Sequence, residues 1–274
     1  MPSPRISFYM TVKNGRPYLR QAVESIRAQD IDDWEAIIVD DGSTDESPAY
    51  LHSLSIEEPR FRVQLTTGIG RGKALNLAVS CCRAPILSNL DADDLAHPSR
   101  ATLLLELFHR NPRYSVITGD RYIVLDDARP HWAPAPIELD PIRDINHLLP
   151  YTNPVKHSSV GIRRNALLAV GGYDECRISQ FDYDLWVRLA AAGQRVGASR
   201  AVLGAKRSHS KQAFERSGHL RYAVRSAQVR WSAIKTLGGS RVVGVGSIGF
   251  HLAWACLPAS VRMRARRLRQ KSPQ

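Results

Sequence analysis

The sequence has few cysteines, and their spacing gives them no obvious partner. Four occur in 274 residues, at positions 81, 82, 176 and 256, and none stands in a Cys-x-x-Cys pair. This argues against a disulfide framework or a zinc site and favours a reducing compartment. The start, MPSPRISFYMTV, has no long apolar region ahead of a small-residue cleavage site. We therefore expect no secretory signal and a cytoplasmic location.

Acidic residues are nearly missing from the last quarter of the chain. Residues 200–274 carry 16 Lys and Arg with one acidic residue, Glu215, whereas residues 1–199 carry 22 basic and 25 acidic residues. The excess positive charge predicts attraction to nucleic acid or to an anionic membrane leaflet. The basic tail, residues 259–274, has no interleaved aromatic residues and no recognisable nucleic-acid-binding module, so we expect no nucleic-acid partner.

Charge of either sign is missing from one stretch of this quarter. Val242–Pro258 is uncharged over 17 residues, close to the shortest length that spans a bilayer. Three interpretations stay open: a helix packed on the protein, a helix lying in the membrane interface, or a spanning helix with the basic tail on the cytoplasmic side. Our hypothesis is peripheral attachment at the inner face of the plasma membrane, with the anionic membrane surface as a partner.

Short apolar runs alternate with helical patterns over the first 120 residues. This alternation predicts an α/β fold with a Rossmann-like, doubly wound and mostly parallel sheet. Residues 120–155 are rich in proline, and we expect them to be irregular. The predicted domains are 1–212 and a basic helical extension, 213–274. The expected strands are Ile6–Val12, Glu35–Asp40, Phe61–Leu65, Ala84–Leu90 and Val116–Gly119, and the expected helices are Tyr18–Gln29, one capped by Ser43, Thr44 or Asp45, Lys73–Ser80, and Ser99–Arg110.

Polar clusters follow three of the expected strands. They are Thr11–Asn14, Asp40–Asp45 and Asp91–Asp94. Ligands of such sheets bind beyond the carboxyl ends of the strands. Asp91 and Asp93 suit Mg²⁺ or Mn²⁺, which prefer oxygen ligands and commonly bridge carboxylates to phosphates. The alternative is that these aspartates only form turns and cap the next helix, although three neighbouring carboxylates repel one another without a cation.

The motifs together resemble the family 2 glycosyltransferases, which have the GT-A fold. The resemblance spans about residues 5–212, and the combination of VDDGSTD with DADD is its most specific part. The segments that carry it are ISFYMTVKNGRPYLRQAVESIRAQ, EAIIVDDGSTDES, GRGKALNLAV, LDADDLAHPSR, HSSVGIRR, GGYDE and DYDLWVRLAAAG.

The resemblance implies a donor, a cation and an acceptor. The donor would be a nucleotide-diphospho-sugar, with UDP as the default nucleotide and GDP or dTDP as alternatives, and the acceptor a glycan or a lipid-linked sugar. The family often has Tyr where this chain has Lys13, which leaves the nucleotide open. The implied donor-binding residues are Thr11, Asn14, Asp41, Arg71, Lys73, Asn76 and Asp91, and the implied ligands of Mn²⁺ or Mg²⁺ are Asp93, Asp91 and His209.

The resemblance also implies a catalytic base. In SQFDYDLWVRL the family's usual Glu-Asp pair reads Phe181-Asp182, so Asp182 would take the proton of the acceptor hydroxyl. A single displacement would then invert the anomeric centre. Asp184 competes for this role, and His157 matches a position near the acceptor. The pathway we expect is cell-surface polysaccharide or glycolipid synthesis; the alternatives are an inactive relative that binds nucleotide sugar, and a nucleotidyltransferase.

Overall fold

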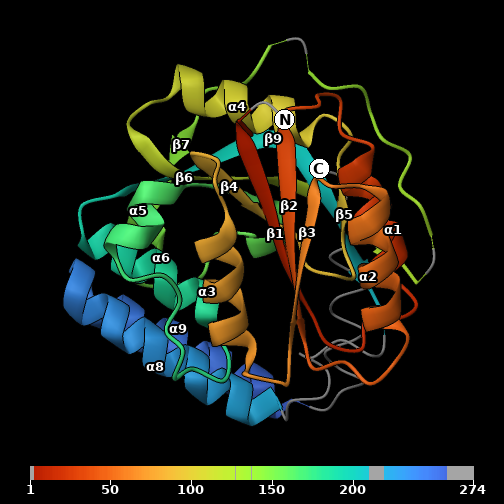
Figure 1. The fold of residues 1–274 in the computed structure, drawn as a ribbon. Coiled ribbons are helices and arrows are strands. Elements are labelled where there is room, and N and C mark those ends of the chain that lie inside the picture. The colour runs from red at the N-terminus through yellow and green to blue at the C-terminus, as the bar shows by residue number, and fades with distance from the viewer. Residues whose placement is uncertain (1–2, 127, 137, 210–218, 258–274) are drawn as a thin grey trace. The chain divides into compact units, whose positions relative to one another are not determined.

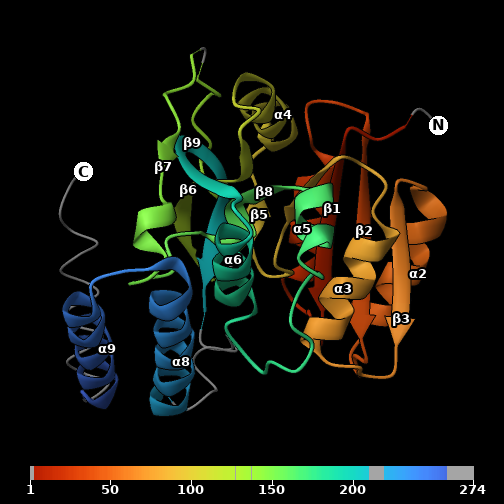
Figure 2. The same cartoon turned by 90° about the vertical axis from the view of Figure 1, so that its left-hand side faces the viewer.

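The computed structural model describes residues 3–126, 128–136, 138–209 and 219–257. The chain divides into two compact units (Figures 1 and 2). One consists of Met1–His147 and Asn153–His209, and the other of Leu148–Thr152 and Ser210–Gln274. The predicted boundary at residue 212 lies outside the described residues and stays a prediction, as does any structure of the basic tail from residue 258 onward.

The first unit is built on one sheet, in which nine strands are found among the described residues. Eight follow the order β3-β2-β1-β4-β8-β6-β9-β5, and β7 pairs with β9. The ladders among β3, β2, β1 and β4 are all parallel, so their carboxyl ends meet at one edge. The strands are β1 (Ile6–Val12), β2 (Trp34–Asp41), β3 (Phe61–Thr66), β4 (Ile86–Asn89), β5 (Leu95–Ala96), β6 (Tyr114–Leu125), β7 (Arg143–Asp144), β8 (Val160–Arg163) and β9 (Arg195–Ser208).

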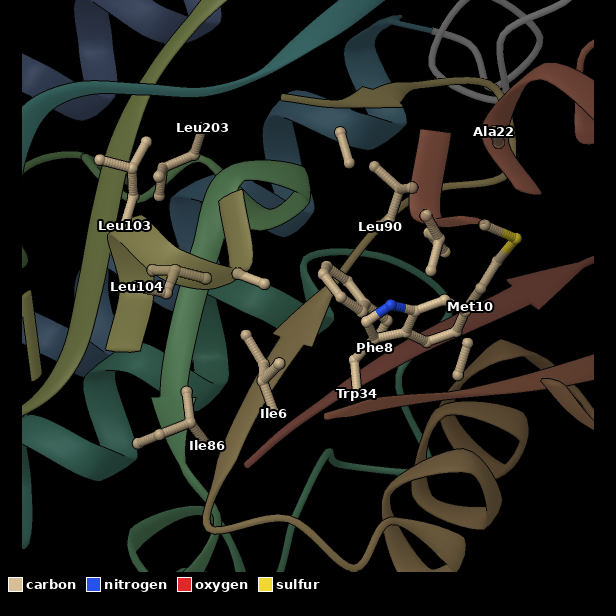
Figure 3. Close-up of a cluster of buried hydrophobic side chains, with 14 of the residues drawn as sticks. Ile6, Phe8, Met10, Ala22, Trp34, Ile86, Leu90, Leu103, Leu104 and Leu203 are labelled. Carbon is tan, nitrogen blue, oxygen red and sulfur yellow. The ribbon is translucent and has the colours of Figure 1, made fainter. Parts of the chain in front are cut away.

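Helices cover the sheet because alternate strand residues bury apolar side chains on each face. On one face, Phe8 and Met10 of β1 pack with Trp34, Leu104 and Leu107 in a single core cluster (Figure 3). The intervening residue Tyr9 points to the other face, which α3 covers. The helices of this unit are α1 (Leu19–Arg27), α2 (Ser47–Glu57), α3 (Arg71–Cys81), α4 (Arg100–Arg110), α5 (Arg164–Ala169) and α6 (Phe181–Ala191), with short 3₁₀ turns at Asn146–Leu148 and His157–Ser159.

The predicted α/β fold is confirmed, and the predicted strands and helices of the first 119 residues all occur. The cap of α2 was predicted wrongly. Its N-cap is Glu46, with no side-chain cap bond. Ser43 instead accepts a hydrogen bond from the backbone of Asn14, and Asp45 accepts from Arg16 and Ser47. The polar residues that follow β2, Ser43 and Asp45, therefore bind the loop that follows β1.

Two further elements depart from the sequence predictions. Strand β6 continues to Leu125, so residues 120–125 are regular rather than irregular. Strand β9 was not predicted, although it pairs with β6 over most of its length. Its 14 residues mix Arg, Ser and Gly with apolar residues, so neither the period of a strand nor that of a helix stands out.

The second unit contains two helices, α8 (His219–Leu237) and α9 (Arg241–Cys256). Tyr151 joins this unit through its own hydrogen bonds: its hydroxyl accepts from Ser240 N and its carbonyl accepts from Ser247 Oγ, both at 2.8 Å. Among the described residues, no helix is long and apolar enough to cross a membrane.

Candidate active site

Asp91 follows the carboxyl end of β4 and forms an ion pair with the guanidinium group of Arg71. Its Oδ1 accepts from Arg71 Nη2 at 2.8 Å and from Asn89 Nδ2 at 3.3 Å. Its backbone N–H donates to Ser158 Oγ at 3.2 Å. Burial acts to raise the pKa of Asp91, but Arg71, and after it His157, outweigh burial and leave that pKa lowered. Asp91 is therefore a carboxylate poised for a cation.

The other two aspartates of the DADD segment point to different surroundings. Asp93 Oδ2 lies 3.0 Å from His209 Nε2, a residue 116 positions away that follows the end of β9. Asp94 is buried and accepts from Arg207 N at 2.9 Å. Burial, together with Asp93 and Asp91, raises the pKa of Asp94 to about 7. Asp91 and Asp93 are thus partly exposed to a ligand, whereas Asp94 is buried and binds the backbone of β9.

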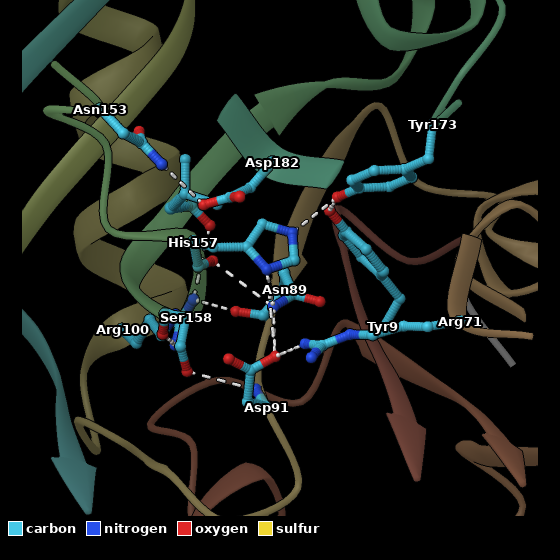
Figure 4. A network of polar contacts seen from close by, with 11 residues as sticks. Tyr9, Arg71, Asn89, Asp91, Arg100, Asn153, His157, Ser158, Tyr173 and Asp182 are labelled. Carbon is cyan, nitrogen blue, oxygen red and sulfur yellow. Dashed lines mark hydrogen bonds and ion pairs between the residues drawn. The ribbon is translucent and has the colours of Figure 1, made fainter. Parts of the chain in front are cut away.

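His157 lies between Asp91 and Asp182 (Figure 4). Its Nδ1 lies 3.1 Å from Asn89 Nδ2, and its Nε2 lies 2.8 Å from the hydroxyl of Tyr173. Because the amide of Asn89 donates to Nδ1, the proton of the neutral ring lies on Nε2 and is donated to Tyr173. Burial lowers the pKa of His157, although both aspartates act to raise it. The imidazole of His157, held by Asn89 and Tyr173, therefore separates the two carboxylates.

A buried pair of tyrosines continues this network. The hydroxyls of Tyr173 and Tyr9 lie 2.6 Å apart, and burial raises the pKa of both phenols. Sequence reasoning assigned no role to either residue. The position of Tyr9 could have indicated a role, because its hydroxyl group lies in the middle of an apolar strand and needs a hydrogen-bond partner there.

Asp182 and Asp184 both lie in the first turn of α6, and their partners differ. Asp182 Oδ2 accepts from Asn153 Nδ2 at 2.9 Å. Asp184 forms two ion pairs, with Arg177 at 2.6 Å and with Arg188 at 2.8 Å. The two side chains are separated by about 200° around the helix. Asp184 is thereby held by two guanidinium groups, whereas Asp182 faces the His157 network.

Phe181 stands where the family usually has a glutamate, and its ring is close to α3. A Cβ placed on Gly72 would lie 3.3 Å from Phe181 Cε1 and 3.0 Å from the backbone of Glu175. Gly72 has no side chain, so α3 and α6 can approach closely. In this chain Phe181 therefore packs α6 against α3 at Gly72.

The residues predicted to bind the nucleoside lie at the ends of β1 and β2, where several already have partners within the protein. Thr11 lies at the end of β1 and is partly exposed. Asp41 accepts from Thr66 Oγ1, Ile69 N and Gly70 N, which fixes the loop before α3. Asn14 Oδ1 accepts from Thr44 N at 2.8 Å. Donor binding by Thr11, Asn14 and Asp41 stays a prediction.

The predicted residues of α3 separate into three kinds. Arg71 reaches Asp91 as described. Asn76 binds the backbone of Tyr173 through both its oxygen and its nitrogen, at 2.8 and 2.9 Å. A Cβ on Gly172 would lie 2.5 Å from Asn76 Oδ1, so Asn76 positions the Gly-Gly-Tyr turn. Lys73 is exposed, and it forms no hydrogen bond or ion pair with the described part of the chain.

Arg100 was quoted in the DADD motif but given no role, and it is fully buried. It donates to Ser88 Oγ, Ser158 O and Asn89 O at 3.0, 2.8 and 2.6 Å. Burial lowers the pKa of Arg100 to about 10. Arg100 thus joins the end of β4 to the turn that carries His157, and so holds Asn89 and His157 together.

Comparison with known proteins shows the family of the chain. Residues 7–171 match the model of glycosyl transferase family 2. The chain belongs to this family. It is 27% identical over 202 residues to the amylovoran biosynthesis glycosyltransferase AmsE of Erwinia amylovora, covering 73% of this chain and 74% of AmsE. The activity class predicted from the sequence, a glycosyltransferase, is therefore confirmed.

Solved structures confirm the GT-A fold. TarS of S. aureus (residues 1–349) in complex with UDP-GlcNAc superposes with a TM-score of 0.68 at 15% identity, over 90% of this chain and 71% of that one. The mannosyltransferase PcManGT from Pyrobaculum calidifontis, in complex with GDP-Man and Mn²⁺, superposes with a TM-score of 0.65 at 20% identity, over 97% of this chain and 80% of that one.

The residues at the sheet edge fit a hard divalent cation in their chemistry. Two carboxylates, Asp91 and Asp93, stand two positions apart, and the imidazole of His209 lies beside Asp93. Oxygen ligands with one imidazole suit Mn²⁺. In the described part of the chain, no three such side chains already stand together as a preformed metal cluster. A cation bound to Asp91 Oδ1 would have to replace Arg71 at that oxygen.

Proposed function

We propose that the chain transfers a sugar from a nucleotide-diphospho-sugar to an acceptor hydroxyl with inversion, in a reaction that depends on Mn²⁺ or Mg²⁺. One observation carries the proposal: Asp91, which follows β4, and Asp182, in α6, lie on either side of the same partly buried histidine, His157 (Figure 4). Both carboxylates also act to raise the pKa of Arg71, Asp91 most strongly. A cation-binding carboxylate and a separate base are the two groups that such a transfer needs.

The donor would lie along the carboxyl ends of β1, β2 and β4. Asp91, Asp93 and His209 would hold the cation, whose chemistry is to neutralise the diphosphate and the charge that develops on the leaving nucleotide. UDP is our default nucleotide. Two neighbouring structures support a nucleotide sugar, since one contains UDP-GlcNAc and another contains GDP-Man with Mn²⁺.

Asp182 would act as the base. Its carboxylate takes the proton of the acceptor hydroxyl as that oxygen attacks the anomeric carbon, and the bond from that carbon to the diphosphate oxygen breaks. Asn153 holds one carboxylate oxygen, Oδ2, by a hydrogen bond and so fixes the direction of the base. A single displacement of this kind inverts the anomeric configuration.

The acceptor would be a glycan or a lipid-linked sugar used in cell-surface polysaccharide or glycolipid synthesis. The name of AmsE, a protein of amylovoran biosynthesis, supports this class. We place the enzyme at the cytoplasmic face of the membrane in this proposal, because a lipid-linked or growing-polymer acceptor would lie there.

The second unit has the composition of a membrane-interface element. Residues 219–257 contain five Lys and Arg and no Asp or Glu. On α9, Val242, Val245 and Phe250 are exposed by 83, 58 and 67%. Exposed apolar side chains on an acid-free pair of helices match an anionic lipid surface. Peripheral attachment at the inner face of the plasma membrane is thus part of the proposal.

A thermal-shift series tests the donor. The full chain is heated with UDP-, GDP- and dTDP-sugars, each with and without Mn²⁺. We expect one nucleotide to raise the melting temperature, and to raise it more with Mn²⁺ than the sum of the two separate shifts. If no nucleotide sugar gives a shift under either condition, the proposed donor class is wrong.

A further inference from the structure

Asp91, a proposed metal ligand, already forms an ion pair with an arginine of the same chain. Arg71 is the first residue of α3, and its guanidinium lies 2.8 Å from Asp91 Oδ1. Each group shifts the pKa of the other in the direction that keeps both charged. A divalent cation ligated by the same oxygen would be repelled by the guanidinium at this distance. The two cations therefore compete for Asp91.

The ion pair between Arg71 and Asp91 can break at a low cost in free energy. The side chains of Arg71 and Asp91 are 45 and 31% exposed, and ion pairs this accessible to water contribute little stability. Asp91 keeps the amide of Asn89 when Arg71 leaves. Arg71 begins a helix, where its own charge adds to the positive end of the helix dipole, a combination that attracts phosphate oxygens.

We infer that Arg71 is a place-holding cation: it neutralises Asp91 in the free protein and moves to the diphosphate of the donor when a divalent cation takes Asp91. The inference rests on the proposed donor and cation. It has a thermodynamic consequence. The divalent cation alone must displace Arg71 with nothing to receive it, whereas with nucleotide present the displaced guanidinium gains a phosphate. Nucleotide and cation therefore bind cooperatively, and Arg71 supplies part of that coupling.

The test is a calorimetric titration of Mn²⁺ into the full chain, with and without saturating UDP. Arg71→Gln removes the competing charge, and Arg195→Gln removes the same charge from an exposed position at the start of β9 that belongs to no proposed site. We expect Arg71→Gln to bind Mn²⁺ alone about three- to fivefold more tightly than the wild type, while Arg195→Gln stays within about twofold of it. The gain in Mn²⁺ affinity caused by UDP should be smaller in Arg71→Gln than in the wild type.

A second variant guards against a folding defect. Arg71→Lys keeps the charge at the same site, and we expect its affinity for Mn²⁺ alone to stay near that of the wild type. If Arg71→Gln and Arg195→Gln bind Mn²⁺ alone equally, or if UDP strengthens Mn²⁺ binding equally in Arg71→Gln and in the wild type, the inference is overturned while the proposed function stands. If the wild type binds no Mn²⁺ even with UDP, the proposed metal dependence fails, and the exchange fails with it.

Discussion

The two aspartates in the first turn of α6 show how partners decide a residue's role. Asp184 is 13% exposed and lies against two arginines, so its charge is already used to join α6 to the turn before it. Asp182 has an amide partner and lies in the His157 network. Two carboxylates of one helical turn therefore differ in their partners, which is why we propose Asp182 rather than Asp184 as the base.

Replacing each aspartate by asparagine should separate stability from chemistry. Asp184→Asn loses two ion pairs and should lower the unfolding free energy by about 1–3 kcal/mol, with turnover per folded molecule retained. Asp182→Asn should melt near the wild-type temperature and turn over about a hundredfold more slowly, or worse. Thermal melts and donor hydrolysis of both variants provide the check. A fully active Asp182→Asn would remove this residue from the role of base.

At the scale of elements, Glu35 joins three strands beneath α3. It lies in β2, is almost fully buried, and accepts from Ser7 Oγ of β1 at 2.7 Å. Its other partners are the backbone N–H of Arg83, just before β4, at 2.6 Å, and the Arg83 guanidinium at 2.8 Å. Burial acts to raise the pKa of Glu35, but these hydrogen bonds together lower it below its ordinary value of 4.5.

This shift predicts a pH-dependent stability. Because the folded-state pKa is depressed, the stabilisation is present above pH 4.5 and is lost as the pH falls through the folded-state value. Glu35→Gln should lower the unfolding free energy by about 1–3 kcal/mol at pH 7 and by less in acid. Urea unfolding between pH 3.5 and 7 measures the difference, with Glu46→Gln, a 77% exposed position, as control. If the loss of unfolding free energy in Glu35→Gln is the same at every pH, the account is contradicted.

The elements also show what the sequence can and cannot predict. β1 and β2 were predicted because apolar runs bounded by turns are local signals, and β9 was not, because it is specified mainly by its pairing with β6. The same limit applies to the site. Asp91 and Asp93 were found from their place after a buried strand. The pairing of Arg71 with Asp91, and the Tyr9–Tyr173–His157 chain, depend on contacts 16 to 164 positions apart, which no local pattern encodes.

At the scale of the whole molecule, the two units differ in charge and in the surface that they expose. The acidic groups of the site belong to the first unit, whereas residues 219–257 have no acidic side chain at all. A protein organised in this way can hold an anionic donor through a cation in one unit and meet an anionic surface with the other. The proposed attachment to lipid therefore needs no contribution from the sheet.

Binding to lipid vesicles tests this division. Phe250→Asp places a charge on the exposed face of α9, and Ile178→Asp does the same at a 76% exposed site of the first unit. We expect the full chain to sediment with vesicles that contain phosphatidylglycerol and not with pure phosphatidylcholine. Phe250→Asp should weaken this binding about tenfold, and Ile178→Asp should leave it unchanged. Equal loss in both variants, or no preference for anionic lipid, would contradict the attachment.

The central claim is that Asp182 drives a single displacement on a sugar held through its diphosphate. The most direct measurement follows, by proton NMR, the anomer first released when the full chain and Mn²⁺ hydrolyse the α-linked nucleotide sugar that binds best, with water as acceptor. The account predicts that the β-anomer of the sugar appears first, before mutarotation, and that Asp182→Asn releases almost none. Release of the α-anomer first, or equal release by the variant, would contradict it.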